Sequence, residues 1–206
     1  MKKNKLILFD WGNIVEDKES MEKGWNELFR ILGYKGTDDV IPYLRKYELT
    51  GIDTMKKLEN AYNSLKEELN LDKDFNTFLD NYDEVFDKTI YYKDVRDYEH
   101  SLKDKCYIGI LSNLLIIDEK RINNQLDLSK YDYVFLSFEL SSRKPYDEIY
   151  EKIMKQIPFN SKDILFIDDS KKNIETADKY GWNTLNCTGK ELDLIKDKCE
   201  DFLKED

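Results

Sequence analysis

Six polar residues with the chemistry of a catalytic site follow short apolar stretches or precede a proline. They are Asp10, the pair Ser112 and Asn113, Lys144, and the pair Asp168 and Asp169. An apolar run as short as Leu6–Phe9, ending in an aspartate, is typical of a strand buried on both faces. In open α/β sheets ligands bind at the edge where parallel strands end. We therefore expect these side chains to converge at one sheet edge.

The chemistry that such a group supports is phosphoryl transfer. Three carboxylates in one pocket need a cation, and Mg²⁺ takes oxygen ligands, often one or two carboxylates together with a substrate phosphate. Asp10 could then attack a phosphoryl group, while a hydroxyl and an ammonium group hold the other phosphate oxygens. Each element also has a structural interpretation, as a turn cap, a helix start or a helix cap, so the hypothesis depends on their joint occurrence.

The elements that must position these groups alternate between strand and helix. We expect strands at 6–9, 106–111, 133–138, 164–167 and 183–187, and helices at 94–103, 118–126, 144–156, 173–180 and 191–203. Pro145 would occupy a tolerated first-turn position of its helix. Such alternation predicts an α/β fold with a parallel sheet and helices on both faces.

Residues 16–88 interrupt this alternation with helical periodicity alone. We expect one helix that ends at Gly33, a second from an N-cap at Thr37 to about Tyr47, and two more over 53–69 and 75–86. No convincing strand is present between Glu16 and Lys88. The sequence therefore predicts a core of residues 1–15 and 89–206, with a helical block at 16–88 inserted after the first strand.

Composition excludes several classes of function. Lys and Arg number 33 against 43 Asp and Glu, and the net charge of −10 gives no general attraction for nucleic acid or anionic membranes. The first apolar run is too short for a signal peptide, and no run reaches transmembrane length. The cysteines, Cys106, Cys187 and Cys199, form no CxxC pair, which suits reduced thiols in the cytoplasm. With His100 as the single histidine, Ser-His-Asp mechanisms and His-rich metal sites are disfavoured. Oligomeric state is left open.

Taken together, the four motifs resemble the haloacid dehalogenase (HAD) superfamily. Asp10 fits the nucleophile, Gly-Ile-Leu-Ser-Asn with Ser112 and Asn113 the second motif, Ser-Arg-Lys-Pro with Lys144 the third, and Asp168-Asp169 the acidic fourth. The resemblance implies a Rossmann-like core, with residues 16–88 as the small helical cap of subfamily I.

The same resemblance implies an activity and a metal site. It implies a phosphatase acting on a small phosphorylated metabolite through a phosphoaspartate on Asp10. It also implies Mg²⁺ held by Asp10, the backbone carbonyl of Gly12 and Asp169, with Asp168 close by. Ser112, Asn113 and Lys144 would bind the phosphate. Trp11, beside the nucleophile, either lines the substrate pocket or packs under the cap.

One position departs from the family pattern. Family phosphatases usually carry a second aspartate two residues after the nucleophile as a general acid, and here that position is Gly12. The Asp-x-Gly-Asn form resembles a branch that includes sugar-1-phosphate phosphatases. Two alternatives stay open beside the phosphatase. A haloacid dehalogenase needs neither metal nor leaving-group acid, and a non-catalytic module would bind phosphate, nucleotide or a protein through the same pocket.

Overall fold

A five-stranded parallel sheet forms the centre of the computed structural model, which describes residues 4–204. In the order of the sheet the strands are β3 (Tyr133–Leu136), β2 (Tyr107–Ser112), β1 (Leu6–Phe9), β4 (Ile164–Asp168) and β5 (Asn183–Asn186). The central strand β1 pairs with β2 and β4, and Leu8 faces Gly109 on one side and Phe166 on the other. All four β1 residues are buried, because helices cover both faces of the sheet.

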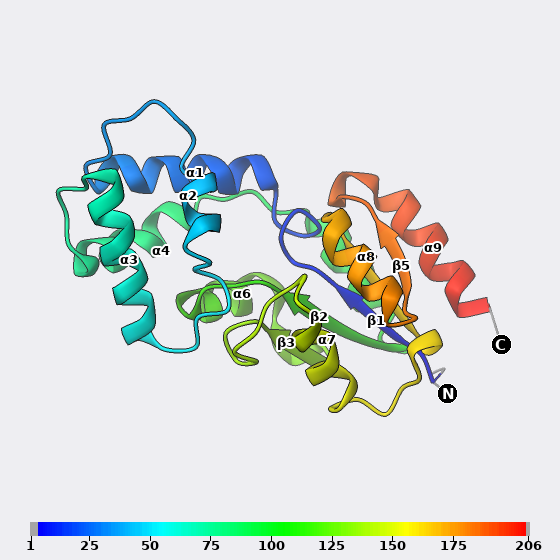
Figure 1. Ribbon diagram of the computed structural model, residues 1–206. Coiled ribbons are helices and arrows are strands. Elements are labelled where there is room, and N and C mark those ends of the chain that lie inside the picture. The colour runs from blue at the N-terminus through cyan, green and yellow to red at the C-terminus, as the bar shows by residue number, and fades with distance from the viewer. Residues whose placement is uncertain (1–3, 205–206) are drawn as a thin grey trace.

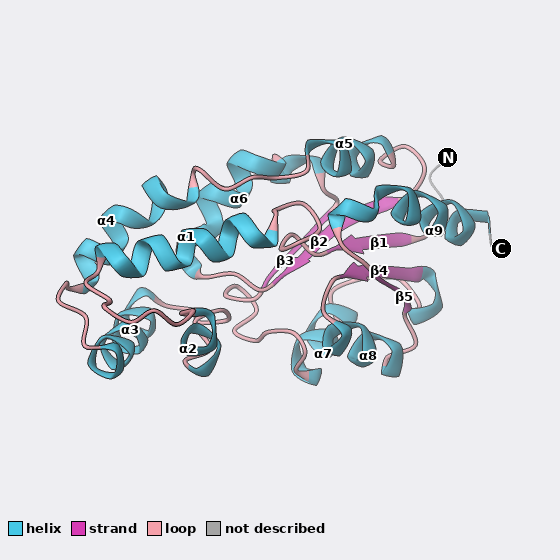
Figure 2. Cartoon of the chain, turned by 90° about the horizontal axis from the view of Figure 1, so that it is seen from above, coloured by secondary structure: helices cyan, strands magenta, loops and turns pink. Residues whose placement is uncertain are grey.

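Alternate residues of β1 pack against different helices. Ile7 and Phe9 belong to the apolar cluster under α5 (Lys93–Ser101), α6 (Glu119–Leu126) and α9 (Leu192–Lys204). Leu6 and Leu8 belong to the cluster under α7 (Asp147–Met154) and α8 (Lys171–Lys179). Figure 2 shows these two sets of helices on opposite sides of the sheet. The α/β fold with a Rossmann-like parallel sheet, expected from the sequence, is confirmed.

Residues 16–88, which lie between β1 and α5 in the chain, contain four helices, and we call this segment the helical insertion. They are α1 (Lys18–Ile31), α2 (Ile41–Lys46), α3 (Met55–Leu69) and α4 (Phe75–Phe86). They share an apolar cluster, which also includes Leu115 of the core and in which the Trp25 and Phe86 rings lie 4.9 Å apart. Figure 1 shows the insertion beside the sheet, away from both chain ends. The inserted all-α cap expected from the sequence is therefore present.

The chain crosses between core and insertion twice, and the two crossings run side by side. The Asp17 amide donates to the Ile90 carbonyl at 2.8 Å, and the Tyr92 amide donates to the Val15 carbonyl at 2.6 Å. The Asp17 carboxylate also caps α1 by accepting a bond from the Ser20 amide. These contacts fix where the insertion leaves the core. Within the described residues, no helix is long and apolar enough to cross a membrane.

Two helix starts predicted from the sequence are wrong. The second helix of the insertion begins at Ile41 and not after Thr37, because Pro42 occupies its first turn and Asp39 accepts the Ile41 amide proton. The helix after Lys144 begins at Asp147, so Pro145 lies outside it and follows a cis peptide bond. The preceding loop is used instead to bring Lys144 into the site described below.

The third strand is shorter than the predicted range 133–138. It ends at Leu136, and the Ser137 amide donates to the Ser112 carbonyl at 3.0 Å. The Ser137 hydroxyl accepts from the Leu114 amide at 2.9 Å and donates to the Leu114 carbonyl at 3.1 Å. These bonds turn the chain out of the sheet, so Phe138 lies in a turn. The other elements agree with the predicted ranges to within about two residues.

Candidate active site

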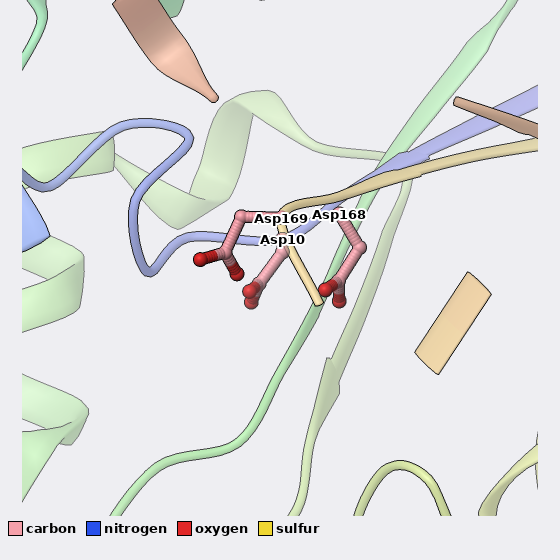
Figure 3. Close-up of side chains that lie close together, drawn as sticks. All are labelled: Asp10, Asp168 and Asp169. Atoms are coloured by element: carbon pink, nitrogen blue, oxygen red, sulfur yellow. The ribbon is translucent and has the colours of Figure 1, made fainter. Parts of the chain in front are cut away.

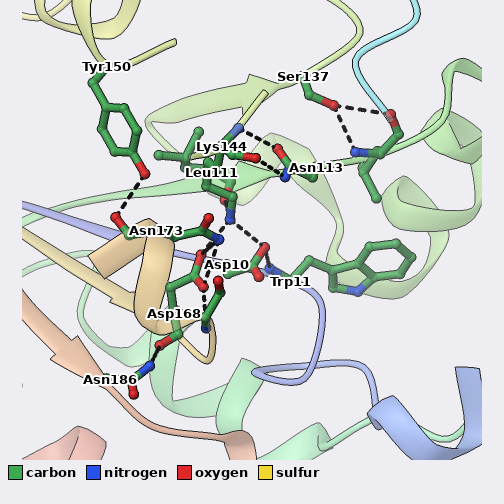
Figure 4. A network of polar contacts seen from close by, with 12 residues as sticks. Asp10, Trp11, Leu111, Asn113, Ser137, Lys144, Tyr150, Asp168, Asn173 and Asn186 are labelled. Carbon is green, nitrogen blue, oxygen red and sulfur yellow. Dashed lines mark hydrogen bonds and ion pairs between the residues drawn. The ribbon is translucent and has the colours of Figure 1, made fainter. Parts of the chain in front are cut away.

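Lys144 forms the centre of the candidate active site. Its side chain is 1% exposed, and Nζ donates to the Leu111 carbonyl at 2.8 Å and to Asp168 Oδ2 at 2.6 Å. Asp10 Oδ1 lies 3.0 Å from the same nitrogen (Figure 4). The Asn113 side chain holds the backbone of Lys144 through two bonds, from Nδ2 to the Lys144 carbonyl and from the Lys144 amide to Oδ1. Asn113 therefore positions Lys144 with its side-chain amide.

Asp168 is the structural partner of this lysine. Its carboxylate is buried and accepts from the Ser170 amide at 2.7 Å and from Asn173 Nδ2 at 2.9 and 3.0 Å. The Tyr150 hydroxyl in turn donates to the Asn173 carbonyl at 2.9 Å. Burial alone lowers the pKa of Lys144, but the charges of Asp10 and Asp168 outweigh it and raise that pKa above its ordinary value. The ammonium group is therefore charged.

Asp10 follows β1 directly and stays anchored to the sheet, because its amide donates to the Ile167 carbonyl at 2.9 Å. Its Oδ1 accepts from the Trp11 amide at 2.8 Å. Burial raises the pKa of Asp10 to about 7, with Asp168 and Asp169 adding to the rise and Lys144 opposing it. A buried carboxylate beside two others is stabilised by a cation, so the site suits a metal ion.

The three carboxylates at the ends of β1 and β4 are close enough to share an ion. Asp10, Asp168 and Asp169 each offer one oxygen, and these oxygens lie within 4.8 Å of one another. Figure 3 shows the three side chains pointing to the same side. Asp169 Oδ2 also accepts from Asn13 Nδ2 at 2.8 Å. This set of hard oxygen ligands fits Mg²⁺ better than Zn²⁺. Because bonds already engage both Asp168 oxygens, Asp10 and Asp169 are the better placed ligands.

Gly12 lies beside Asp10, and a side chain at this position would meet no close contact. A Cβ built on Gly12 would have Asp10 Oδ2 as its neighbour at 3.9 Å, and the Gly12 backbone is outside the left-handed region. Neither the space nor the conformation requires glycine, so its consequence is chemical: this position supplies a carbonyl and no acid.

A cavity of about 800 Å³ separates the site from the helical insertion. Asp10, Ser112 and Lys144 line it from the core, and Met21 and Trp25 line it from α1. Ser112 ends β2 and is buried, so its hydroxyl lies at the edge of the sheet where the strands end. The insertion therefore faces Asp10 across the cavity.

Trp11 lies between the cavity and α6 of the core. It lines the cavity, and its indole packs against the guanidinium of Arg121, which lies 4.4 Å from the ring centre. Arg121 could not be recognised from the sequence, because an arginine among polar helix residues looks like part of a solvated face. The role of Asn173 was not predicted either, since its only signal is its place in the first turn of the helix after Asp168-Asp169.

Fold, site and sequence define the class of this protein. The sequence model of the haloacid dehalogenase-like hydrolases matches residues 7–187. The chain therefore belongs to the haloacid dehalogenase-like hydrolase family, as the four motifs indicated.

Three similar proteins extend the comparison. The chain is 26% identical over 200 residues to the D-ribitol-5-phosphate phosphatase of Bacteroides thetaiotaomicron, covering 87% of this chain and 90% of that one. A HAD-like family hydrolase of Porphyromonas gingivalis superposes with a TM-score of 0.71 at 19% identity, over 98% and 99% of the two chains. A variant HAD family enzyme of B. thetaiotaomicron, solved with magnesium and inorganic phosphate, superposes with a TM-score of 0.70 at 19% identity, over 92% and 96%.

Proposed function

We propose that this hydrolase is a Mg²⁺-dependent phosphatase that acts on a small phosphorylated metabolite, with Asp10 as nucleophile. The observation that carries the proposal is the placement of the buried Lys144 ammonium between Asp10 and Asp168 at the end of the central strands, facing the cavity. A charged group fixed there stabilises the negative charge of a phosphoryl group next to the attacking carboxylate.

Residues of this chain supply the nucleophile and the phosphate contacts of the proposed reaction, and solvent supplies the water and the proton. An Asp10 oxygen forms a bond to phosphorus as the bond to the leaving oxygen breaks, which gives a phosphoaspartate and a leaving alkoxide that takes up a proton. Water then adds to the phosphoaspartate and releases phosphate and free Asp10. Ser112 and Lys144 hold the other phosphate oxygens. Mg²⁺, when held by Asp10, Asp169 and the Gly12 carbonyl, would neutralise charge on the phosphate and the carboxylates.

The substrate class is supported by the cavity and by one relative. The cavity presents polar side chains of the insertion, Glu22 and Arg45, beside apolar ones such as Met21 and Trp25. This mixture suits a small leaving group that carries hydroxyls. The relative named for D-ribitol 5-phosphate makes phosphorylated polyols the first substrates to test.

The three cysteines are free and buried, which supports our proposal of a cytoplasmic location.

We also propose that residues 16–88 act as a cap that opens and closes over Asp10, as a unit distinct from the core of 1–15 and 89–206. The two crossings, near Glu16-Asp17 and Lys88-Tyr91, would be the hinges. Closing such a cap excludes water and orders the pocket. The apolar cluster that the four helices of the insertion share supports their movement as one body, and Leu115 is its buried contact from the core.

The test is hydrolysis of 4-nitrophenyl phosphate with MgCl₂ and with excess chelator. We expect turnover that needs Mg²⁺ and that falls at least about 10³-fold in Asp10→Asn, since the nucleophile is lost. Asp127→Asn, a surface position with φ 53° that asparagine tolerates, is the matched control. Wild-type rates in Asp10→Asn would overturn the covalent mechanism.

Two further measurements separate the phosphatase from the alternative functions. Chloride release from 2-chloropropionate that persists in chelator would identify a dehalogenase instead. Binding of inorganic phosphate with Mg²⁺, without turnover of any phosphate ester, would identify the non-catalytic module that Gly12 allows.

A further inference from the structure

Arg121 lies at the centre of a buried ion cluster outside the proposed reaction centre. This α6 residue is 6% exposed, and its NH1 donates to Glu16 Oε1. Its Nε and NH2 donate to Asp118 Oδ1 at 3.2 and 2.8 Å. The Arg121 guanidinium therefore binds two carboxylates. Asp118 directly precedes the same helix, α6, and Glu16 belongs to the first chain crossing.

The two carboxylates extend the cluster into the helical insertion and the second crossing. Asp118 Oδ1 also accepts from the Tyr82 hydroxyl of α4 at 2.8 Å. Glu16 Oε1 also accepts from the Thr89 hydroxyl at 2.8 Å. The cluster thus joins four parts of the chain that would shift against one another if the insertion moved: α6, α4 and the two crossings.

The same guanidinium reaches the residue next to the nucleophile. It lies 4.4 Å from the centre of the Trp11 ring, and the Trp11 amide donates to Asp10 Oδ1 at 2.8 Å. The first crossing folds back on this point, because the Val15 and Glu16 amides both donate to the Trp11 carbonyl, at 2.9 and 3.0 Å. Residues 10–16, which we call the nucleophile loop, are therefore held at Trp11 and at Glu16 by one arginine.

The charges of the cluster depend on one another. Although burial opposes it, the charges of Asp118 and Glu16 raise the pKa of Arg121 further, and burial raises the pKa of Glu16. Burying three charged groups is costly, and such a cluster adds little stability over apolar packing. Its position, between the nucleophile loop and the insertion, suggests a role beyond stability.

We propose that Arg121 is a positioning residue for the proposed phosphatase reaction. Arg121 holds the nucleophile loop, and with it Asp10, in place while the insertion covers the site. The inference rests on the proposed function for its kinetic readout. In this proposal Glu16 and Asp118 orient Arg121. Tyr82 couples the insertion to the cluster through its hydrogen bond to Asp118.

The kinetic test uses 4-nitrophenyl phosphate and saturating MgCl₂. We expect Arg121→Lys and Glu16→Gln to lower kcat about 10- to 100-fold with KM within about two-fold, because a lysine cannot form the forked contacts and a misplaced nucleophile slows attack. Because the two residues act as a unit, the double variant should be no slower than the slower single variant. Arg96→Lys is the matched control, since Arg96 is a partly buried arginine of α5 bonded to the Gln125 carbonyl and to Asp97.

A second measurement keeps the inference testable without turnover. The indole N–H resonance of Trp11 can be assigned by Trp11→Phe, and Tyr82→Phe removes only the hydroxyl that contacts Asp118. We expect Tyr82→Phe and Glu16→Gln to shift the Trp11 resonance while the Trp182 resonance stays in place. Arg96→Lys should shift neither.

The outcomes separate the two proposals. Wild-type kcat in folded Arg121→Lys and Glu16→Gln would overturn the positioning role, and so would a Trp11 resonance that neither Tyr82→Phe nor Glu16→Gln shifts. A wild-type protein that hydrolyses no phosphate ester would overturn the proposed function, and the Trp11 resonance would then decide the inference on its own. A kcat that falls only in proportion to the loss of folded protein would mean that the cluster is merely structural.

Discussion

Gly12 lies next to the carboxylate of Asp10, and a Cβ built on Gly12 would make an ordinary van der Waals contact with Asp10 Oδ2 at 3.9 Å. A side chain placed there would lie beside the proposed nucleophile, at the position where family phosphatases usually carry their general acid. The wild-type protein lacks an acid at this position, so we expect its kcat to depend steeply on leaving-group pKa. Gly12→Asp should fold and should flatten this dependence, because general acid catalysis is worth about 10²–10⁴-fold.

The measurement is a series of substituted phenyl phosphates assayed with both proteins. Gly12→Asn is the control, because it fills the same space without supplying a proton at neutral pH. A flat dependence already in the wild-type protein would show that another group donates the proton, and the role assigned to Gly12 would be wrong.

Binding of Mg²⁺ should depend on the protonation of Asp10. Burial raises the pKa of this carboxyl to about 7, and the ion needs the ionised form. The affinity for Mg²⁺ should therefore be full above about pH 8 and should fall as the pH drops through 7, with protons released on binding. Titration calorimetry in two buffers of different ionisation enthalpy measures that release, and binding independent of pH between 6 and 8 would contradict the expectation.

Removing the buried ammonium should cost both activity and stability. In Lys144→Met, Asp10 and Asp168 would lie close together without the cation that now lies 3.0 and 2.6 Å from their oxygens. We expect the free energy of unfolding at pH 8 to fall by about 3–5 kcal/mol, since breaking a buried ion pair leaves charge uncompensated. Added Mg²⁺ should restore part of it. Lys172→Met, at an exposed position on the cavity rim, is the control in denaturant titrations.

The sequence was sufficient for the parts of the site that depend on strand ends. Asp10, Ser112 and Asp168 each end a short apolar run, and parallel pairing alone brings such residues to one edge. The family and the α/β fold followed from the same motifs. Lys144 was found through its motif, although its helix was placed wrongly, because nothing in the local pattern shows that the Asn113 side chain holds its backbone in a loop.

The contacts between the insertion and the core could not be predicted. Glu16, Tyr82 and Arg121 are far apart in the chain, and each has an ordinary local interpretation as part of a polar face or an aromatic stripe. Their contact depends on how four helices pack over the sheet edge, which periodicity does not determine. The hydrogen-bond partners of Asp168 could not be predicted either, because Asn173 and Lys144 come from different segments.

Glu99 should make the stability of the whole protein depend on pH. This α5 side chain is fully buried, accepts from the Tyr131 hydroxyl at 2.5 Å, and has at Oε1 no hydrogen-bond partner among residues 4–204. Burial raises its pKa from 4.5 to about 8. Between these two values the folded protein keeps a proton that the unfolded chain has lost, so the free energy of unfolding falls as the pH rises, by up to about 1.4 kcal/mol per pH unit.

Glu99→Gln keeps the shape and removes the ionisation. We expect it to be more stable than the wild-type protein at pH 8 by about 1–3 kcal/mol and nearly equal at pH 5, in urea titrations at both pH values. Glu67→Gln, at an exposed position of α3, should change neither. If Glu99→Gln is no more stable than the wild-type protein at pH 8, then Glu99 is ionised in the folded protein and its proton is not the source of the pH dependence.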